Sequence, residues 1–418
     1  MNKRAKQEPQ IRVQGFDEAW EQRKLGDLVS LRGRIGFRGY KETDLVAKGN
    51  GAITFSPADI DDMGIISFEN NKYLSWEKYD ESPEIQVEVG DILFTKTASI
   101  GKVGFVRDLK EKATINPQFA LLTPKDDSDG FFIYLSVRSD LFMKQVRGIT
   151  GGSSVPTMSQ EKLKELYFFC PSKLEQKKIG AFFLLLDNLI TLHQREYEKL
   201  KNIKHSMLEK MFPKTGENFP EIRFKGFSDP WKPCKLKDIA YKVTAKNIDT
   251  LYVETLTNSA ELGVISQKDY FDHDISNLEN IDGYYIVENN DFVYNPRIST
   301  LAPVGPINRN KLGRTGVMSP LYTVFRTHDV DEEYVEWFFK SSRWHKFMYF
   351  NGDTGARSDR FAIKDDVFFE MPIPIPHIDE QRKIGEFFCQ LDRLIELENK
   401  ELEKIKHIKT ACLEKMFV

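Results

Sequence analysis

Basic and small polar side chains gather in glycine-rich stretches that could bind phosphate groups or the edges of nucleic-acid bases. Glycine lets the backbone approach a ligand closely, and the guanidinium fork of arginine fits phosphate or the edge of guanine. In the first half of the chain, the candidate nucleic-acid contacts are Arg32, Arg34, Arg38, Lys41, Lys96, Thr97, Ser99, Lys102, Arg147, Ser153 and Ser154. In the second half, they are Lys246, Asn247, Asn295, Arg297, Ser299, Thr300, Arg357, Ser358 and Arg360. An ordinary exposed turn is the alternative explanation for each stretch taken singly.

Sequence patterns that would supply catalysis are incomplete in this chain. The stretch TASIGKVGF lacks the glycine that precedes a phosphate-binding Walker loop and the Ser or Thr that would follow Lys102. The stretch NPQF at Asn116 resembles the motif of adenine methyltransferases but lacks its second proline. Glu175 and Lys177 have a spacing that suits a metal nuclease, yet both lie in a predicted helix. We therefore expect a non-catalytic chain that holds no metal and no cofactor of its own.

The composition is typical of a folded protein without membrane spans. Hydrophobic residues make up 40% and charged residues 29% of the 418 residues. The longest apolar run ends at Asp187, and the first residues lack the apolar stretch of a signal peptide, so we expect a cytoplasmic location. A formal charge of −3 argues against a uniformly basic nucleic-acid binder but allows a basic face. The four cysteines show no Cys-x-x-Cys spacing, which favours reduced thiols over disulfides or a zinc site.

Two long segments repeat each other at a constant offset. The segment that runs from Glu175 to LEKMF agrees with the segment from Glu380 at 23 of 38 positions without a gap. Apolar residues in both follow a three-four spacing, which predicts two amphipathic helices about 57 Å long. A second repeated pair begins at Pro9 and Pro220 and includes a matching tryptophan in each copy. The chain is therefore two copies of one plan.

The two predicted helices are natural partners, because identical apolar faces pair well about a twofold axis. We expect an antiparallel two-helix coiled coil. His193 and Glu398 are polar residues at the same aligned place in the middle of each apolar stripe. Full antiparallel overlap would bring them together, where they could fix the register of the pair. The alternative is that both side chains rotate outward into solvent.

Between the helices, short alternating apolar runs and turn signals predict a mixed α/β domain in each half, and thus an α+β chain overall. Each domain is also expected to contain one helix, at residues 131–146 and 332–350. Asp91 and the three residues after it match the stretch from Asp291, but most other domain positions differ. We expect five segments: an N-terminal segment 1–19 that packs near the C-terminal helix, domains 20–171 and 214–376, and helical regions 172–213 and 377–418.

These repeats resemble the specificity subunit of type I restriction-modification systems. The resemblance rests on P-x-x-x-E-Q-x-K-I-G at Pro171 and Pro376, on the doubled LEKMF, and on W-x-x-x-x-L-x-D at Trp20 and Trp231. It covers nearly the whole chain in order. It implies two target recognition domains related by a pseudo-twofold axis and separated by the two conserved helical regions.

The resemblance also implies a function. Each domain would bind one half of a split sequence in double-stranded DNA, while the helices set the gap and dock two methyltransferase subunits, with restriction subunits bound through them. S-adenosylmethionine, ATP and magnesium would belong to those partner subunits. A DNA adenine methyltransferase or fused restriction enzyme with its own catalytic site is the alternative. The family motifs lie mainly in the helical regions and where the domains join them, so they do not identify the base contacts.

Overall fold

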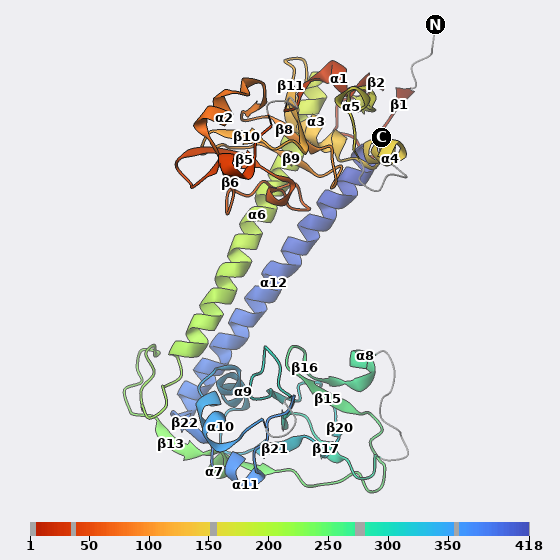
Figure 1. Ribbon diagram of the computed structural model, residues 1–418. Helices are drawn as coiled ribbons and strands as arrows, with labels where there is room; N and C mark the ends of the chain where they lie inside the picture. Colours follow the sequence, from red (N-terminus) through yellow and green to blue (C-terminus); the bar gives the residue numbers. More distant parts are fainter. Residues whose placement is uncertain (1–5, 35–38, 151–156, 272–280, 355–358, 418) are drawn as a thin grey trace. The chain divides into compact units, whose positions relative to one another are not determined.

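The computed structural model describes residues 6–34, 39–150, 157–271, 281–354 and 359–417 (Figure 1). The chain forms two compact units. The first unit contains residues 1–194 and 400–418, and the second contains residues 195–399. Each long helix therefore contributes residues to both units.

The first unit is built on two sheets. An antiparallel four-stranded sheet has the order β3 (Val29–Arg32), β11 (Phe119–Pro124), β8 (Ile92–Thr95) and β9 (Val103–Phe105). A five-stranded sheet has the order β4 (Leu45–Val46), β6 (Lys72–Ser75), β5 (Gly51–Phe55), β10 (Ala113–Ile115) and β7 (Gln86–Val87). A small sheet joins β1 (Lys6–Gln7), β2 (Trp20–Lys24) and β12 (Tyr167–Cys170).

The second unit repeats the four-stranded sheet with the same topology. Its order is β14 (Ala240–Lys242), β21 (Thr323–Thr327), β18 (Phe292–Tyr294) and β19 (Ile307–Arg309). The other pairs are β13 (Lys232–Lys235) with β22 (Pro372–Ile375), β15 (Leu256–Ser259) with β16 (Gly263–Ser266), and β17 (Tyr285–Val287) with β20 (Gly316–Met318). The mixed α/β character predicted for both domains is confirmed.

Short helices cover these sheets. They are α1 (Leu25–Leu28), α2 (Trp76–Asp80), α3 (Gly130–Val137), α4 (Asp140–Thr150) and α5 (Gln160–Glu165) in the first unit, and α7 (Leu236–Ile239), α8 (Gln267–Phe271), α9 (Glu332–Lys340), α10 (His345–Asn351) and α11 (Asp365–Phe368) in the second. The single helix predicted in each domain was wrong, because each is two helices, α3 with α4 and α9 with α10. Serines stand at both breaks, where Phe142 N donates to Ser139 Oγ and Ser341 Oγ donates to Phe338 O. Such local side-chain bonds compete with continuation of a helix.

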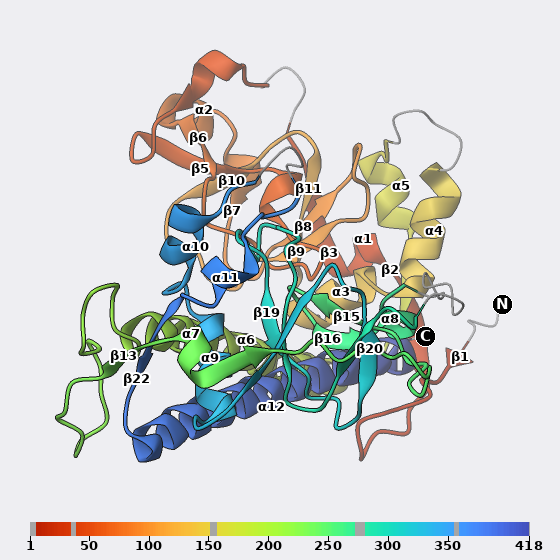
Figure 2. The ribbon, with the colours of Figure 1, turned by 90° about the horizontal axis from the view of Figure 1, so that it is seen from below.

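The two long helices are α6 (Lys173–Lys210) and α12 (Ile378–Met416), and Figure 2 shows α12 as one uninterrupted helix. In the first unit, the ring of Phe183 lies 5.9 Å from that of Phe417. In the second unit, the rings of Phe212 and Phe388 lie 6.3 Å apart and stack.

Repeated ion pairs show the direction of the helices in each unit. Lys409 Nζ lies 2.6 Å from Asp187 in the first unit, and Lys204 Nζ lies 2.5 Å from Asp392 in the second. These pairs occupy the same positions of the repeat. In each unit, the ion pair and the ring contact show that residues later in α6 lie beside residues earlier in α12. The helices therefore run antiparallel in each unit, as predicted. His193 belongs to the first unit and Glu398 to the second, and their role in register stays a prediction.

The glutamate of the doubled E-Q motif binds an arginine that comes before the domain in sequence. Glu175, 1% exposed, accepts two hydrogen bonds of 2.8 Å from the guanidinium of Arg12. Glu380, fully buried, accepts bonds of 2.7 and 2.8 Å from Arg223 in the same bidentate geometry. Such charge-assisted pairs fix both position and orientation. They fasten the segment that precedes each domain to the first turn of a long helix.

The glutamine of the same motif fastens the helix that covers the sheet. Gln176 accepts a 3.0 Å bond from the backbone N–H of Asp129, and Gln381 accepts a 2.9 Å bond from that of Asp331. Each aspartate in turn caps the N-terminus of a short helix, α3 or α9, with its carboxylate. The repeated motif therefore joins a long helix to its domain by hydrogen bonds that do not depend on the rest of the domain sequence.

Candidate nucleic-acid interface

The predicted contact residues lie at equivalent places in the two domains. The loop from β8 to β9 carries Lys96, Thr97, Ser99 and Lys102, and the loop from β18 to β19 carries Asn295, Arg297, Ser299 and Thr300. Both loops leave the same strand of the same four-stranded topology. Structural equivalence thus connects two stretches, TKTASIGK and YNPRIST, that share little sequence.

A second segment lies beside this loop in each domain: residues 157–158, which follow the predicted Ser153 and Ser154, in the first, and the predicted Arg360 in the second. In the first, Thr97 pairs with Thr157 in an antiparallel bridge, and Met158 N donates to Lys96 O at 2.8 Å. In the second, Arg297 pairs with Arg360 in the same way. We call these two arrangements, residues 96–102 with 157–158 and residues 295–305 with 359–361, the first and second loop pairs. In the second domain, the structure therefore brings together two stretches that the sequence singled out separately.

Strand geometry brings the third stretch to the same edge. β3 and β8 are both antiparallel to β11, so they run parallel and end at one edge of the sheet. The equivalent strands β14 and β18 are both antiparallel to β21. The chain after β3 carries Arg34 and Lys41, and the chain after β14 carries Lys246 and Asn247. Arg38, Ser153, Ser154, Arg357 and Ser358 lie outside the described residues.

Several predicted contacts support the protein instead of facing outward. Arg34 is 7% exposed and donates to Ser82, Thr114 and the carbonyl of Ile115, with its guanidinium 5.1 Å from the ring centroid of Tyr40. Burial lowers the pKa of Arg34 from its ordinary value. An arginine held in this way orders the chain around it, and its donors are directed into the domain.

Asn247, Arg32 and Lys102 have similar supporting contacts. Asn247 is 2% exposed, donates to the carbonyl of Tyr252 at 2.8 Å and accepts from its N–H at 3.1 Å. Arg32 donates to Thr123 Oγ1 at 2.5 Å, and Lys102 Nζ donates to the carbonyl of Pro57 at 3.1 Å. Exposed side chains among the predicted set are Lys41, Ser99, Arg147, Lys246, Arg297, Ser299 and Thr300.

Lys96 is half-buried at the base of the first loop pair. Its burial lowers its pKa from the ordinary lysine value, and the charge of Glu161 opposes that shift. A partly desolvated ammonium interacts more strongly with an approaching anion than a fully hydrated one does. Lys96 is therefore suited to a phosphate or to the acceptor atoms of a base.

The second loop pair borders a pocket of about 780 Å³. Its lining includes Asn295, Arg297, Ser299 and Thr300 together with Tyr322. The side chain of Arg297 is 71% exposed, with the Asp359 carboxylate 3.9 Å away. Asn295 uses its amide internally, since it accepts from Arg297 N at 3.0 Å. Arginine is thus the group in this lining best placed to meet phosphate or guanine.

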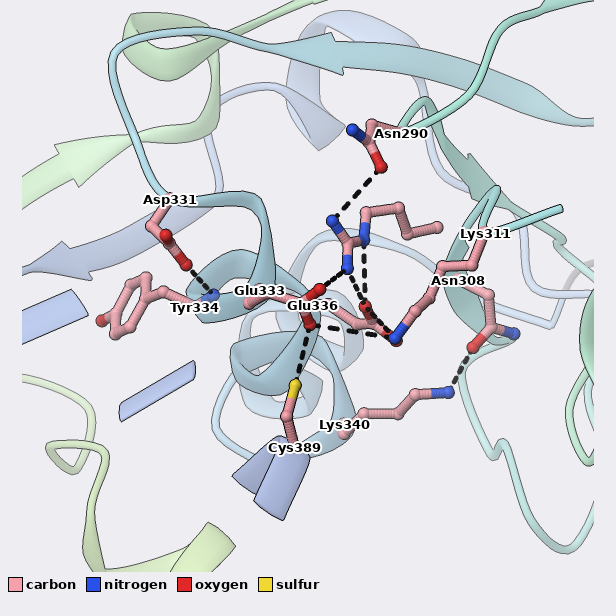
Figure 3. Close-up of polar contacts among 10 residues, drawn as sticks. Asn290, Asn308, Lys311, Asp331, Glu333, Tyr334, Glu336, Lys340 and Cys389 are labelled. Carbon is pink, nitrogen blue, oxygen red and sulfur yellow. Dashed lines mark hydrogen bonds and ion pairs between the residues drawn. The ribbon is translucent and has the colours of Figure 1, made fainter. Parts of the chain in front are cut away.

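A polar cluster anchors β19, the strand that follows the second loop (Figure 3). Arg309 Nε donates to Glu336 at 2.9 Å, and Arg309 Nη2 donates to Glu333. Lys311 Nζ lies 3.3 Å from Glu336, and the Cys389 thiol donates to Glu333 at 3.2 Å. Burial alone would raise the pKa of Glu333, but hydrogen bonds from Arg309 and Cys389 lower it below its ordinary value. The cluster holds β19 against α9 and α12.

A chain of amide hydrogen bonds connects α9 to the second loop. Lys340 Nζ donates to Asn308, whose amide donates to Asn258 Oδ1 at 2.6 Å (Figure 3 shows the first of these bonds). Asn258 donates to the carbonyl of Val293 at 2.7 Å, and its own carbonyl accepts from Asn295 at 2.8 Å. Sequence reasoning missed Asn258 and Asn308, because nothing in one sequence separates a buried asparagine from one in an exposed turn.

The incomplete catalytic motifs have structural roles. Asn116 Oδ1 accepts from Gln118 N at 3.0 Å, so NPQF forms a turn between β10 and β11. Glu175 is the buried partner of Arg12. Within the described ranges, no group of three His, Cys, Asp or Glu side chains could hold a metal ion. None of the helices in that part of the chain combines the length and the apolar character that crossing a membrane requires.

The family model for the type I restriction modification DNA specificity domain matches residues 17–202 and 228–407. The chain belongs to this family. The two matches reproduce the internal repeat, and they confirm the resemblance found in the sequence. The chain is a specificity subunit and not an enzyme in its own right, as predicted.

Relatives of the same kind cover nearly the whole chain. The MjaX specificity subunit of Methanocaldococcus jannaschii, a putative one by its own name, is 26% identical over 95% of this chain and 92% of its own. The MjaVIII specificity subunit of the same organism is 21% identical over 95% of this chain and 91% of its own. A type I S subunit from M. genitalium shares the fold, with a TM-score of 0.55, 13% identity, and 99% of each chain covered. A structure from work on assembly of the type I R-M system has a TM-score of 0.51 at 15% identity, over 95% of this chain and 97% of its own.

Proposed function

We propose that each domain of this specificity subunit recognises one half of a bipartite DNA sequence, and that α6 and α12 set the gap between the halves. The observation that carries this proposal is the equivalence of the two loop pairs. Each lies at the corresponding end of the equivalent four-stranded sheet in its own domain, yet the residues differ: Lys96 and Ser99 in one, Arg297 and Thr300 in the other. Equivalent position with different chemistry is what recognition of two different half-sites requires.

Exposed cations of the two domains would supply affinity that depends on salt. Arg147 and Lys41 in the first domain and Lys246 and Arg297 in the second are exposed and would contact phosphates. The supporting role of Arg34 and Asn247 fits the same proposal, because base recognition depends on loops held in one conformation.

We also propose that the helices dock methyltransferase subunits. Leu192 is 54% exposed and Leu397 is 50% exposed, and they occupy the same position of the two repeats. Exposed leucines on a paired helix favour a protein partner. Two copies of one apolar site would bind two copies of one partner. In this arrangement, S-adenosylmethionine binds the methyltransferase subunits, while ATP and magnesium act on restriction subunits.

Sequencing of methylated adenines in cells with and without this gene tests the proposal. We expect a split motif, two short defined halves around a fixed undefined gap, that is methylated only when the gene is present. An identical methylation pattern in both strains, in cells whose methyltransferase subunit is expressed, would contradict it.

A further inference from the structure

The second loop carries a tight hairpin tip. Ser299 and Ala302 exchange two backbone hydrogen bonds of 3.0 and 3.1 Å, and Ser299 Oγ accepts a third from Ala302 N. Thr300 and Leu301 form the two-residue tip between them. The Leu301 side chain is 71% exposed, whereas Ile100, in the turn of the equivalent loop of the first domain, is only partly exposed and packs against the core.

The fold enforces the exposure of Leu301. Its neighbours Ala302 and Val304 are 7% and 0% exposed, so the base of the hairpin is packed into the domain. Gly305 has a positive φ of 85°, and a Cβ added there would lie 2.2 Å from the carbonyl oxygen of Asn295. The return of the chain beneath the tip therefore requires glycine. A leucine on such an anchored turn cannot bury itself by a small local movement.

Polar and apolar groups alternate around this tip. Leu301 lines the same pocket as Arg297 and Thr300. Leu321, 61% exposed, lies two residues before β21 and lines another pocket with Pro296. Arg297 and the exposed Leu301 give the tip one cationic and one apolar group, which suits a ligand with both anionic and apolar parts.

Duplex DNA has one apolar group in its major groove, the C5-methyl of thymine, which lies beside the hydrogen-bonding edges of the bases. We propose that Leu301 contacts this methyl group, so that the half-site of the second domain contains an A·T pair whose thymine is selected at that position. This inference rests on the proposed function and names part of its target. Arg297 on the same loop supplies the neighbouring contact to phosphate or guanine. In the first domain, the turn of the corresponding loop carries Ile100, which is partly buried against the core of that domain.

Uracil in place of thymine tests the contact, since it removes only the methyl group. The assay measures how tightly the full complex of specificity and methyltransferase subunits binds synthetic duplexes that carry the methylated motif. Each thymine of the second half-site would be replaced singly by deoxyuridine. We expect one replacement to weaken binding about fourfold, the effect of losing one buried methyl group.

The variants Leu301→Ala and Val89→Ala complete the test. Val89 is 62% exposed and stands before β8, at the end of that strand opposite the first loop. With Leu301→Ala, the thymine duplex should bind no better than the uracil duplex, whereas Val89→Ala should keep the fourfold difference. A half-site without thymine, or equal uracil sensitivity in both variants, overturns the inference while leaving the proposed function intact. Failure of the complex to bind the motif duplex at all overturns both.

Discussion

The two equivalent ion pairs between α6 and α12 allow one substitution to be compared at a buried and at an exposed site of the same chain. Asp187 and Asp392 are equivalent in the repeat, and each binds a lysine of the other helix. Their surroundings differ. The side chains of Lys409 and Asp187 are 5% and 11% exposed, whereas those of Lys204 and Asp392 are 27% and 45% exposed. The same substitution, Asp→Asn, therefore removes the same charge from a buried cluster, in which Asp187 also accepts a hydrogen bond from Arg107, and from an exposed pair.

Asp187→Asn should cost far more stability than Asp392→Asn. It leaves the buried ammonium of Lys409 without its carboxylate, and breaking a buried pair in this way costs about 3–5 kcal/mol. An asparagine oxygen can still accept one hydrogen bond, so we expect about 3 kcal/mol. Asp392→Asn breaks a solvent-exposed pair worth about 0.2–1 kcal/mol. Lys204 also keeps its position 4.8 Å from the ring centroid of Trp337.

Thermal unfolding of the full chain, followed by circular dichroism, measures the difference. One kcal/mol shifts the Tm of a domain of 150–250 residues by about 2–4 °C. Asp187→Asn should thus lower the Tm of the first unit by about 6–12 °C, and Asp392→Asn should lower that of the second by less than about 4 °C. Equal shifts from the two substitutions would refute the reasoning that burial decides the strength of the pair.

Three further predictions concern the loops and the thiols. Gly305→Ala should destabilise the second unit by about 1–3 kcal/mol in urea unfolding, because the φ of Gly305 is positive and the Asn295 carbonyl blocks a Cβ. Gly313 also has a positive φ but has open space around it, so Gly313→Ala should lower the free energy of unfolding by less. Arg297→Ala should weaken DNA binding and reduce the slope of log affinity against log salt concentration by about 1. An unchanged slope would show that Arg297 does not contact a phosphate. Burial raises the pKa of Cys170 to about 12, so its thiol stays protonated at pH 8. After treatment of the native chain with iodoacetamide, mass spectrometry should find Cys170 unalkylated. Rapid alkylation would contradict its burial.

The sequence predicted the helical regions well, because their signal is local and doubled. An apolar stripe with helical spacing depends only on neighbouring residues, and two matching stripes imply a pair. The residues that bind the helices to the domains, such as Glu175 and Gln176, were visible as a repeated motif. Arg12 recurs as Arg223 in the second repeated pair, but its pairing with Glu175, like that of Asp129 with Gln176, was not visible, because pairing over such distances in sequence depends on the folded domain.

The candidate interface was only partly predictable for a related physical reason. Loop chemistry identified stretches that the structure places together, and Arg297 and Ser299 are exposed there as a contact would need. Arg34 and Asn247 have the same residue types but are buried and hydrogen-bonded. A polar side chain in a glycine-rich stretch can serve a ligand or hold its own loop, and only tertiary contacts decide between these roles.

Exchange of one domain tests the central claim most directly. Residues 20–171 would be replaced by the corresponding domain of another family member, and methylated adenines would be sequenced in cells that express the exchanged chain with its methyltransferase. We predict that one half of the methylated motif changes, while the other half and the length of the gap stay the same. A change in both halves, or a change in the gap alone, would contradict two independent recognition domains held by one helical pair.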